Sequence, residues 1–150
     1  MARNKYHTST AAIFAVAAEL SRKGYNVGFT VGNRPRFDLF CGVPDGESFK
    51  IQVKGISNAN GLYVQESFFT ARPQDNLFII IVLVPKPEEP EDCPFRFFIL
   101  SHEDARREAE NMPHFARDGY SNGLNWGSIC KKDHQNRWDK LPPLNSEVNE

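Results

Sequence analysis

The chain has 150 residues, a length that is typical of one domain. Hydrophobic residues make up 40% and charged residues 25%, which excludes a chain that is disordered throughout. The longest apolar run, residues 77–84, is too short to span a bilayer, and we expect no signal peptide and no membrane partner. Cys41, Cys93 and Cys130 are odd in number and far apart, so we expect reduced thiols in a cytoplasmic protein.

The net charge of −1 conceals a difference between the two halves of the chain. Residues 1–75 carry 9 Lys and Arg against 6 Asp and Glu, and residues 76–150 carry 9 against 13. The weakly basic first half is compatible with a partner that carries phosphate groups, but the balance excludes a histone-like chain.

Apolar residues at helical spacing predict a first helix over residues 8–23. The repeat consists of Ile13, Val16, Ala17 and Leu20. The hydroxyl residues Thr8, Ser9 and Thr10 are candidates to cap its start, and Gly24 can end it in a left-handed turn. Glu19 borders the apolar stripe of this helix.

Strand patterns follow the helix along the chain. They predict strands over residues 25–31, 37–43, 49–54, 62–65, 77–84 and 95–100. Pro44, Asp45 and Gly46 form a strong turn signal that predicts a hairpin. The run 77–84 is apolar on both faces, which predicts the central buried strand of a covered sheet, and the acidic, Pro-rich stretch 85–94 predicts an exposed connection.

Two helices are expected in the last third of the chain. Ser101 and Asp104 have the spacing of a capping box, which predicts a helix that runs to about Asn111. Asp133 is a candidate cap for a short helix through Trp138. The element order predicts an α/β or α+β fold, a mixed sheet flanked by helices, in a single domain over residues 1–144 with a frayed tail at 145–150.

The second and third strands carry the residues that suggest chemistry. Residues alternate between the two faces of a strand, so Gln52 and Lys54 share a polar face. If the hairpin packs its apolar faces together, Asp38 falls on the same side as these two residues. One surface of the sheet would then present a carboxylate, an amide oxygen and an ammonium group.

Asp38 followed by Gln52-Val53-Lys54 resembles the active-site signature of the PD-(D/E)XK nuclease superfamily, which has the restriction-endonuclease-like fold. Glu19 is similar to the acidic residue that many members carry on the first helix. The wording Ile51-Gln52-Val53-Lys54 is similar to the branch that uses glutamine in place of the second acidic residue. The resemblance covers residues 9–84 in motif and element order.

The resemblance implies a metal-dependent DNA endonuclease, with RNA not excluded as a substrate. Asp38, Gln52 and Glu19 would bind Mg²⁺, or Mn²⁺ in its place, because hard cations prefer oxygen ligands. The family pattern adds the backbone oxygen of Val53 as a further ligand. Lys54 would orient the attacking water or stabilise the phosphate charge. A homodimer or larger assembly is expected for cutting both strands.

Other residues give weaker signals. Arg34 and Arg36, in a loop before the Asp38 strand, and Asn58, after Lys54, could contact nucleic acid, but solvation and turn chemistry explain them equally well. Cys130 and His134 have ligand-like spacing without a second pair, so a zinc site is not expected.

Two alternatives to a nuclease stay open. One is a nuclease-fold module that binds nucleic acid or a protein without cleavage. The other is an unrelated globular protein whose strand reads Gln-x-Lys by coincidence.

Overall fold

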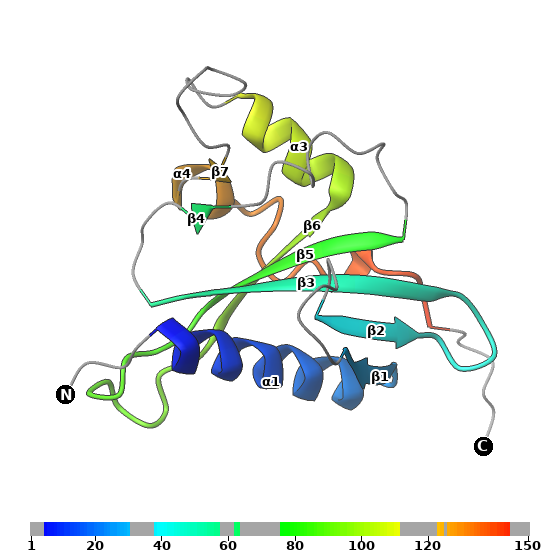
Figure 1. The fold of residues 1–150 in the computed structure, drawn as a ribbon, viewed down its shortest axis with the longest axis horizontal. Helices are drawn as coiled ribbons and strands as arrows, with labels where there is room; N and C mark the ends of the chain where they lie inside the picture. Colours follow the sequence, from blue (N-terminus) through cyan, green and yellow to red (C-terminus); the bar gives the residue numbers. More distant parts are fainter. Residues whose placement is uncertain are drawn as a thin grey trace.

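The chain folds around a five-stranded mixed sheet in the order β1-β2-β3-β5-β6. This computed structural model describes residues 5–30, 38–57, 62–63, 76–111, 123–124 and 126–144. The strands of the sheet are β1 (Asn26–Phe29), β2 (Leu39–Gly42), β3 (Ser48–Ile56), β5 (Leu77–Leu83) and β6 (Arg96–Ser101). Helix α1 (Lys5–Lys23) lies on one side of the sheet. The helices α3 (His102–Glu110) and α4 (Trp126–Ile129) and the small sheet of β4 (Leu62–Tyr63) and β7 (Gly123–Leu124) lie on the other side (Figure 1).

Helix α1 begins three residues before the expected start. The predicted hydroxyl caps are therefore wrong, because they lie inside the helix: Thr8 is buried, and Ser9 Oγ donates to the carbonyl oxygen of Lys5 at 3.0 Å. The predicted end is confirmed. Gly24 has φ +107°, and Tyr25 N donates to Leu20 O at 3.0 Å, the pattern of a Schellman motif.

The sheet combines a hairpin with a parallel crossover. β1, β2 and β3 pair antiparallel, and the predicted turn at Pro44–Gly46 closes the β2–β3 hairpin with a hydrogen bond from Gly46 N to Val43 O at 2.9 Å. β3 pairs parallel with β5, which pairs antiparallel with β6. β5 is buried on both faces up to Leu83, as expected, but the middle of the sheet is β3.

Each face of the sheet has its own apolar core. The core under α1 includes Val16, Leu20, Leu39, Cys41, Phe49, Ile51, Val53, Ile80 and Ile99. The core under α3 includes Leu77, Ile79, Ile81, Phe98, Leu100, Ala105 and Ala109. The apolar faces of the hairpin strands pack together under α1, as the sequence predicts.

The last described segment covers the edge of β6. Ile99 N donates to His134 O at 2.8 Å, and Asn136 N donates to Phe97 O at 2.9 Å. The helix expected from Asp133 is therefore wrong, because its backbone groups bond to the sheet. A short 3₁₀ turn, Trp138–Lys140, follows instead.

The remaining expectations concern the cap of α3, the C-terminal tail and membrane-spanning segments. Ser101 and Asp104 form the predicted capping box at the start of α3. Residues 145–150, the expected tail, lie outside the described residues. Among the described helices, none is long and apolar enough to cross a membrane.

Candidate functional site

The hairpin fixes the backbone of Asp38 from two sides. Asp38 N donates to Ile51 O at 2.8 Å, although Leu39 is the residue paired with Ile51 in the strand register. Two consecutive residues thus face one, which is the arrangement of a β-bulge. On the other side, Thr30 N donates to Asp38 O at 3.1 Å. A bulge re-aims a side chain, and here it determines where the Asp38 carboxylate points.

The Asp38 carboxylate lies against the backbone of β3. Val53 N donates to Asp38 Oδ2 at 2.8 Å. Since β2 begins at Leu39, no strand residue of β2 lies opposite Val53, and the carboxylate takes the place of a backbone acceptor for its N–H. The N–H and C=O of one strand residue point to the same side, so the Val53 carbonyl also lies on the β2 side. Among the described residues, Val53 is the hydrogen-bond donor to this carboxylate, and Oδ1 is left as an acceptor for a further ligand.

The electrostatics of Asp38 are those of a partly desolvated anion. Burial raises the pKa of Asp38, while the hydrogen bond from Val53 and the positive charge of Lys54 act in the opposite direction. Lys54 is therefore close enough to act on the carboxylate. The effect of burial is the larger, so the favourable interactions with Val53 and Lys54 do not fully offset the desolvation of the charged carboxylate.

Gln52 and Lys54 lie on the face of β3 that is turned away from α1. In the parallel register they are paired with Ile79 and Ile81, which belong to the core under α3. Both side chains are half-buried. The structure thus brings Asp38, Val53 and Lys54 together, and places Gln52 on the same polar face of β3 as Lys54.

Glu19 lies on the side of α1 that faces away from β1 and β2. Phe14, about 140° away around the helix, contacts the ring of Phe29 in β1 at 5.6 Å. Lys23 is one turn after Glu19 on its own flank, and its ammonium lies 5.2 Å from the ring of Trp138. Glu19 makes an ion pair with Arg22 at 2.9 Å. Its role as a metal ligand stays a prediction.

Three of the weaker predictions cannot be placed. Arg34, Arg36 and Asn58 lie outside the described residues. Within the described part of the chain, no group of three or more His, Cys, Asp or Glu side chains is arranged to hold a metal ion.

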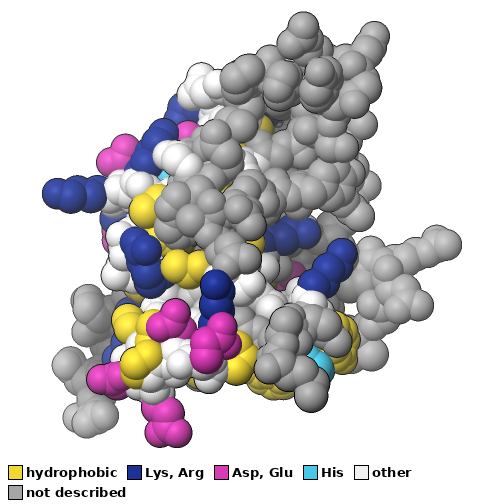
Figure 2. Space-filling view, turned by 90° about the vertical axis from the view of Figure 1, so that its left-hand side faces the viewer, with side chains coloured by type: hydrophobic (Ala, Val, Ile, Leu, Met, Phe, Trp, Pro, Cys, Tyr) yellow, Lys and Arg dark blue, Asp and Glu magenta, His cyan; other side chains and the backbone are white. Residues whose placement is uncertain are grey.

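Charges are separated at the end of the molecule where β3 runs out. Figure 2 shows several acidic side chains in the lower part of this face and Lys and Arg side chains above them, with further acidic side chains at the upper left. The exposed connection between β5 and β6 supplies acidic residues: Glu88, Glu89, Glu91 and Asp92.

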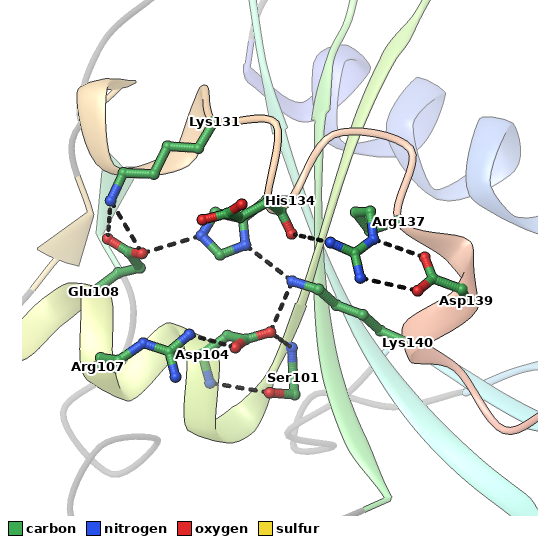
Figure 3. A network of polar contacts seen from close by, with 10 residues as sticks. Ser101, Asp104, Arg107, Glu108, Lys131, His134, Arg137, Asp139 and Lys140 are labelled. Atoms are coloured by element: carbon green, nitrogen blue, oxygen red, sulfur yellow. Dashed lines mark hydrogen bonds and ion pairs between the residues drawn. The ribbon is translucent and has the colours of Figure 1, made fainter.

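A second polar cluster joins α3 to the segment 131–140 (Figure 3). His134, 1% exposed, lies between Glu108 Oε1 at 3.1 Å and Lys140 Nζ at 3.0 Å. The ammonium of Lys140 can only donate, so His134 Nδ1 accepts and Nε2 donates to Glu108. Lys140 also binds Asp104 Oδ2 at 2.9 Å.

We call this cluster the clasp, because its polar contacts tie α3 to the segment 131–140. It consists of Asp104, Glu108, Lys131, His134 and Lys140. Both ring nitrogens of His134 are engaged, and Lys131 bonds both oxygens of Glu108, at 2.9 and 3.2 Å. Cys130 Sγ accepts from Arg96 at 3.7 Å, so it does not pair with His134. Sequence reasoning found the capping box of α3 but missed the clasp, because its partners come from separate elements.

No family model and no curated protein matches the chain. The structure is similar to that of a bacterial homing endonuclease, I-Ssp6803I, with a TM-score of 0.56 over 91% of this chain and 92% of that chain. The two sequences are 17% identical, so the likeness shows the fold alone. The chain has an α+β, nuclease-like fold, which confirms the fold class expected from sequence.

Proposed function

We propose that this chain is a metal-dependent nuclease of the PD-(D/E)XK type, in the branch with glutamine in the second acidic position. The observation that carries the proposal is the position of Asp38. Its carboxylate is bonded to the backbone of the Gln-Val-Lys strand at 2.8 Å, and the charge of Lys54 acts on it. The nuclease-like fold supports this reading, and the homing endonuclease likeness favours DNA as the substrate.

Magnesium is the cation that the proposed oxygen donors would suit best. Mg²⁺ is commonly held by one or two carboxylates, and water molecules and substrate phosphate complete its shell. Asp38 would supply the carboxylate, Gln52 an amide oxygen and Val53 a backbone oxygen. Glu19, which lies on the side of α1 away from β1 and β2 and pairs with Arg22, would act as a second acid through water. The partly desolvated carboxylate of Asp38 would gain from a cation, since burial already raises its pKa.

The residues divide the work of hydrolysis. A bound Mg²⁺ or Mn²⁺ would polarise the phosphate and make water a better nucleophile. Lys54 would hold the attacking water or the developing negative charge with its ammonium group. Asp38, anchored through Val53, would keep the metal ligands aligned with Lys54. A homodimer would supply a second site for the opposite DNA strand.

A plasmid-nicking assay tests the proposal. We expect Mg²⁺- or Mn²⁺-dependent nicking that EDTA stops, and Asp38→Asn and Lys54→Met should each reduce the rate about 100-fold or more. Asp45→Asn is the matched control, because Asp45 is an exposed turn residue of the same hairpin with φ 55°, a conformation that Asn tolerates. Nicking that survives Asp38→Asn would refute the assignment.

The second candidate is a nuclease-fold module that binds without cleavage. The neutral side chain of Gln52 favours it, as does the ion pair of Glu19 with Arg22, since both leave Asp38 as the one carboxylate placed at β3 by the described contacts. This module would bind DNA in a salt-dependent way, and would leave every plasmid form intact with either metal.

A further inference from the structure

The two edges of the five-stranded sheet differ in how they are covered. Residues 134–136 bond to the backbone of β6 and cover that edge. β1 lies at the other margin, beside α1 (Figure 1), and within the described part of the chain β2 is the one strand that pairs with it. An edge strand presents N–H and C=O groups that can pair with another chain. β1 is therefore the place where a further strand could join the sheet.

The register determines which backbone groups of β1 point outward. Thr30 N donates to Asp38 O at 3.1 Å, so these two residues form a hydrogen-bonded pair next to the β1–β2 ladder. Bonded and non-bonded pairs alternate along an antiparallel ladder, so Gly28 is in a bonded pair and its neighbours Val27 and Phe29 are not. The N–H and C=O groups of Val27 and Phe29 therefore point away from β2, toward the open edge.

An exposed and uncharged apolar surface adjoins this edge. Phe14 of α1 is 60% exposed, Phe29 of β1 is 52% exposed, and the centres of their rings lie 5.6 Å apart. Residues 26–30 carry no charge and no proline, so apart from its shortness β1 has none of the features that protect edge strands from pairing. The helix residues one turn to either side of Phe14 are also uncharged; they are Thr10, Ala11, Ala17 and Ala18.

A second copy of this chain suits the surface, because a two-fold contact would be self-complementary. In an antiparallel pairing centred on Gly28, Val27 of each copy lies opposite Phe29 of the other, and their outward groups bond to one another. The same pairing brings together an aromatic and a β-branched side chain, a favourable cross-strand combination. A two-fold contact also brings each charge near its own copy, so an uncharged surface can face itself without repulsion. A charged partner would find no opposite charge here to recognise it.

We propose that β1 pairs antiparallel with β1 of a second copy, so that two chains form a two-fold dimer with one continuous sheet, and that Phe14 and Phe29 cover the junction. The inference deepens the proposed function by naming the surface of its homodimer. It rests on that function only for the use of a second site, since its structural grounds are the contacts of β1 and α1.

The size of the contact sets the expected strength of association. β1 has four residues, so the strand pairing is short, and the two rings supply most of the apolar area. Small interfaces are typical of weak complexes, so the dimer should form and dissociate with protein concentration. Aromatic residues at the centre of an interface carry a large share of the binding energy, and Phe29 is therefore the residue to change.

Sedimentation equilibrium in EDTA, without DNA, tests the interface. The wild type should change from monomer to dimer between roughly 1 μM and 1 mM protein. Phe29→Lys and Phe29→Glu should each weaken dimerisation about 10-fold or more, because the introduced charges lie on the same face, diagonally across the two-fold axis. An equimolar mixture of the two variants should regain the dimer at low ionic strength, since opposite charges then face each other. Recovery in the mixture also shows that both variants are folded.

Tyr6→Lys is the matched control for adding a charge at an exposed ring. Tyr6 is 72% exposed and lies about two turns before Phe14 on α1, away from β1. This variant should dimerise as the wild type does.

Amide hydrogen exchange measured by NMR locates the contact on β1. The N–H groups of Val27 and Phe29 point outward in one chain and bond to the other copy in the dimer. Their exchange should therefore slow about 10-fold or more between dilute and concentrated protein. The N–H of Gly28 is the internal reference, because its partner in the β1–β2 ladder is present in both states.

The dimer and the nuclease function fail in different ways. A chain that stays monomeric over this range, or a dimer that tolerates both Phe29→Lys and Phe29→Glu, overturns the interface even if Asp38-dependent nicking is observed. A dimer that depends on Phe29 but leaves the exchange of Val27 and Phe29 unchanged also overturns it, because the strands are then not paired. Recovery in the mixed variants together with slowed exchange supports the interface, even where no plasmid is nicked.

Discussion

The close approach of α1 to the site strand gives a sharp prediction about Gly55, the residue after Lys54. A Cβ at this position would lie 2.7 Å from Thr8 O and 2.8 Å from Ala12 Cβ. Thr8 O is a backbone atom and Ala12 Cβ is bonded directly to the backbone, so neither can move aside by a side-chain rotation. Gly55→Ala must push α1 away from β3 and should cost about 1–3 kcal/mol, the usual range for an overpacked core.

Urea denaturation followed by circular dichroism measures this cost, and Gly42→Ala is the control. A Cβ at Gly42 meets its nearest described atom at an ordinary contact distance of 3.6 Å. That variant should be unchanged or up to about 1 kcal/mol more stable, because alanine restricts the unfolded chain. The melting temperature of Gly55→Ala should fall by roughly 2–4 °C for each kcal/mol. Equal stability of the two variants would refute the tight packing of α1 on the site strand.

Three further predictions concern titratable groups. The pKa of Asp104 is lowered to about 2, because burial, which acts to raise it, is outweighed by the hydrogen bonds and charge of partners such as Lys140. The charged carboxylate of Asp104 therefore stabilises the fold fully above its usual pKa of 3.8, and this contribution is lost as pH falls toward 2. Lys140→Met should therefore lower the melting temperature at pH 7 and flatten its decline between about pH 4 and 2 in calorimetry, and an unchanged decline would contradict the clasp. Burial raises the pKa of Cys41 to about 12, so a thiol reagent at pH 8 should modify the half-buried Cys93 first and reach Cys41 at the rate of unfolding; equal rates would contradict the burial. Mg²⁺ should raise the melting temperature of the wild type and leave that of Asp38→Asn unchanged, and an equal rise in both would place the metal elsewhere.

Much of the fold could be predicted because local signals and burial agree. Residues 49–54 alternate in polarity, and the structure places Phe49, Ile51 and Val53 under α1 as that alternation requires. The capping box at Ser101 and the left-handed turn at Gly24 are also local, since each needs only residues a few positions apart.

The errors arise where distant partners decide the local structure. Asp133 suggested a helix, but the following backbone bonds to β6, more than thirty residues earlier in the chain. Likewise, the hydroxyl residues at 8–10 have the side chains of good helix caps, yet the helix begins at Lys5, and Thr8 is a buried residue inside it. Periodicity placed Glu19 beside the apolar stripe without showing which flank faces Asp38. The β-bulge at Asp38 is equally invisible in the sequence, because it depends on pairing with Ile51 across the hairpin.

The burial of Asp38 makes its charged carboxylate unfavourable in the folded protein when no cation is bound. Burial raises the pKa of Asp38, so the folded state binds its proton more tightly than the unfolded state does. The sign follows directly: the stability associated with this group is present below its unfolded pKa and is lost as pH rises through its folded pKa. At pH 7 the charged carboxylate therefore opposes folding. Asp38→Asn should stabilise the metal-free protein, and under the proposed function it should slow nicking about 100-fold or more. A core residue shows the opposite pattern, because its replacement lowers stability and activity together.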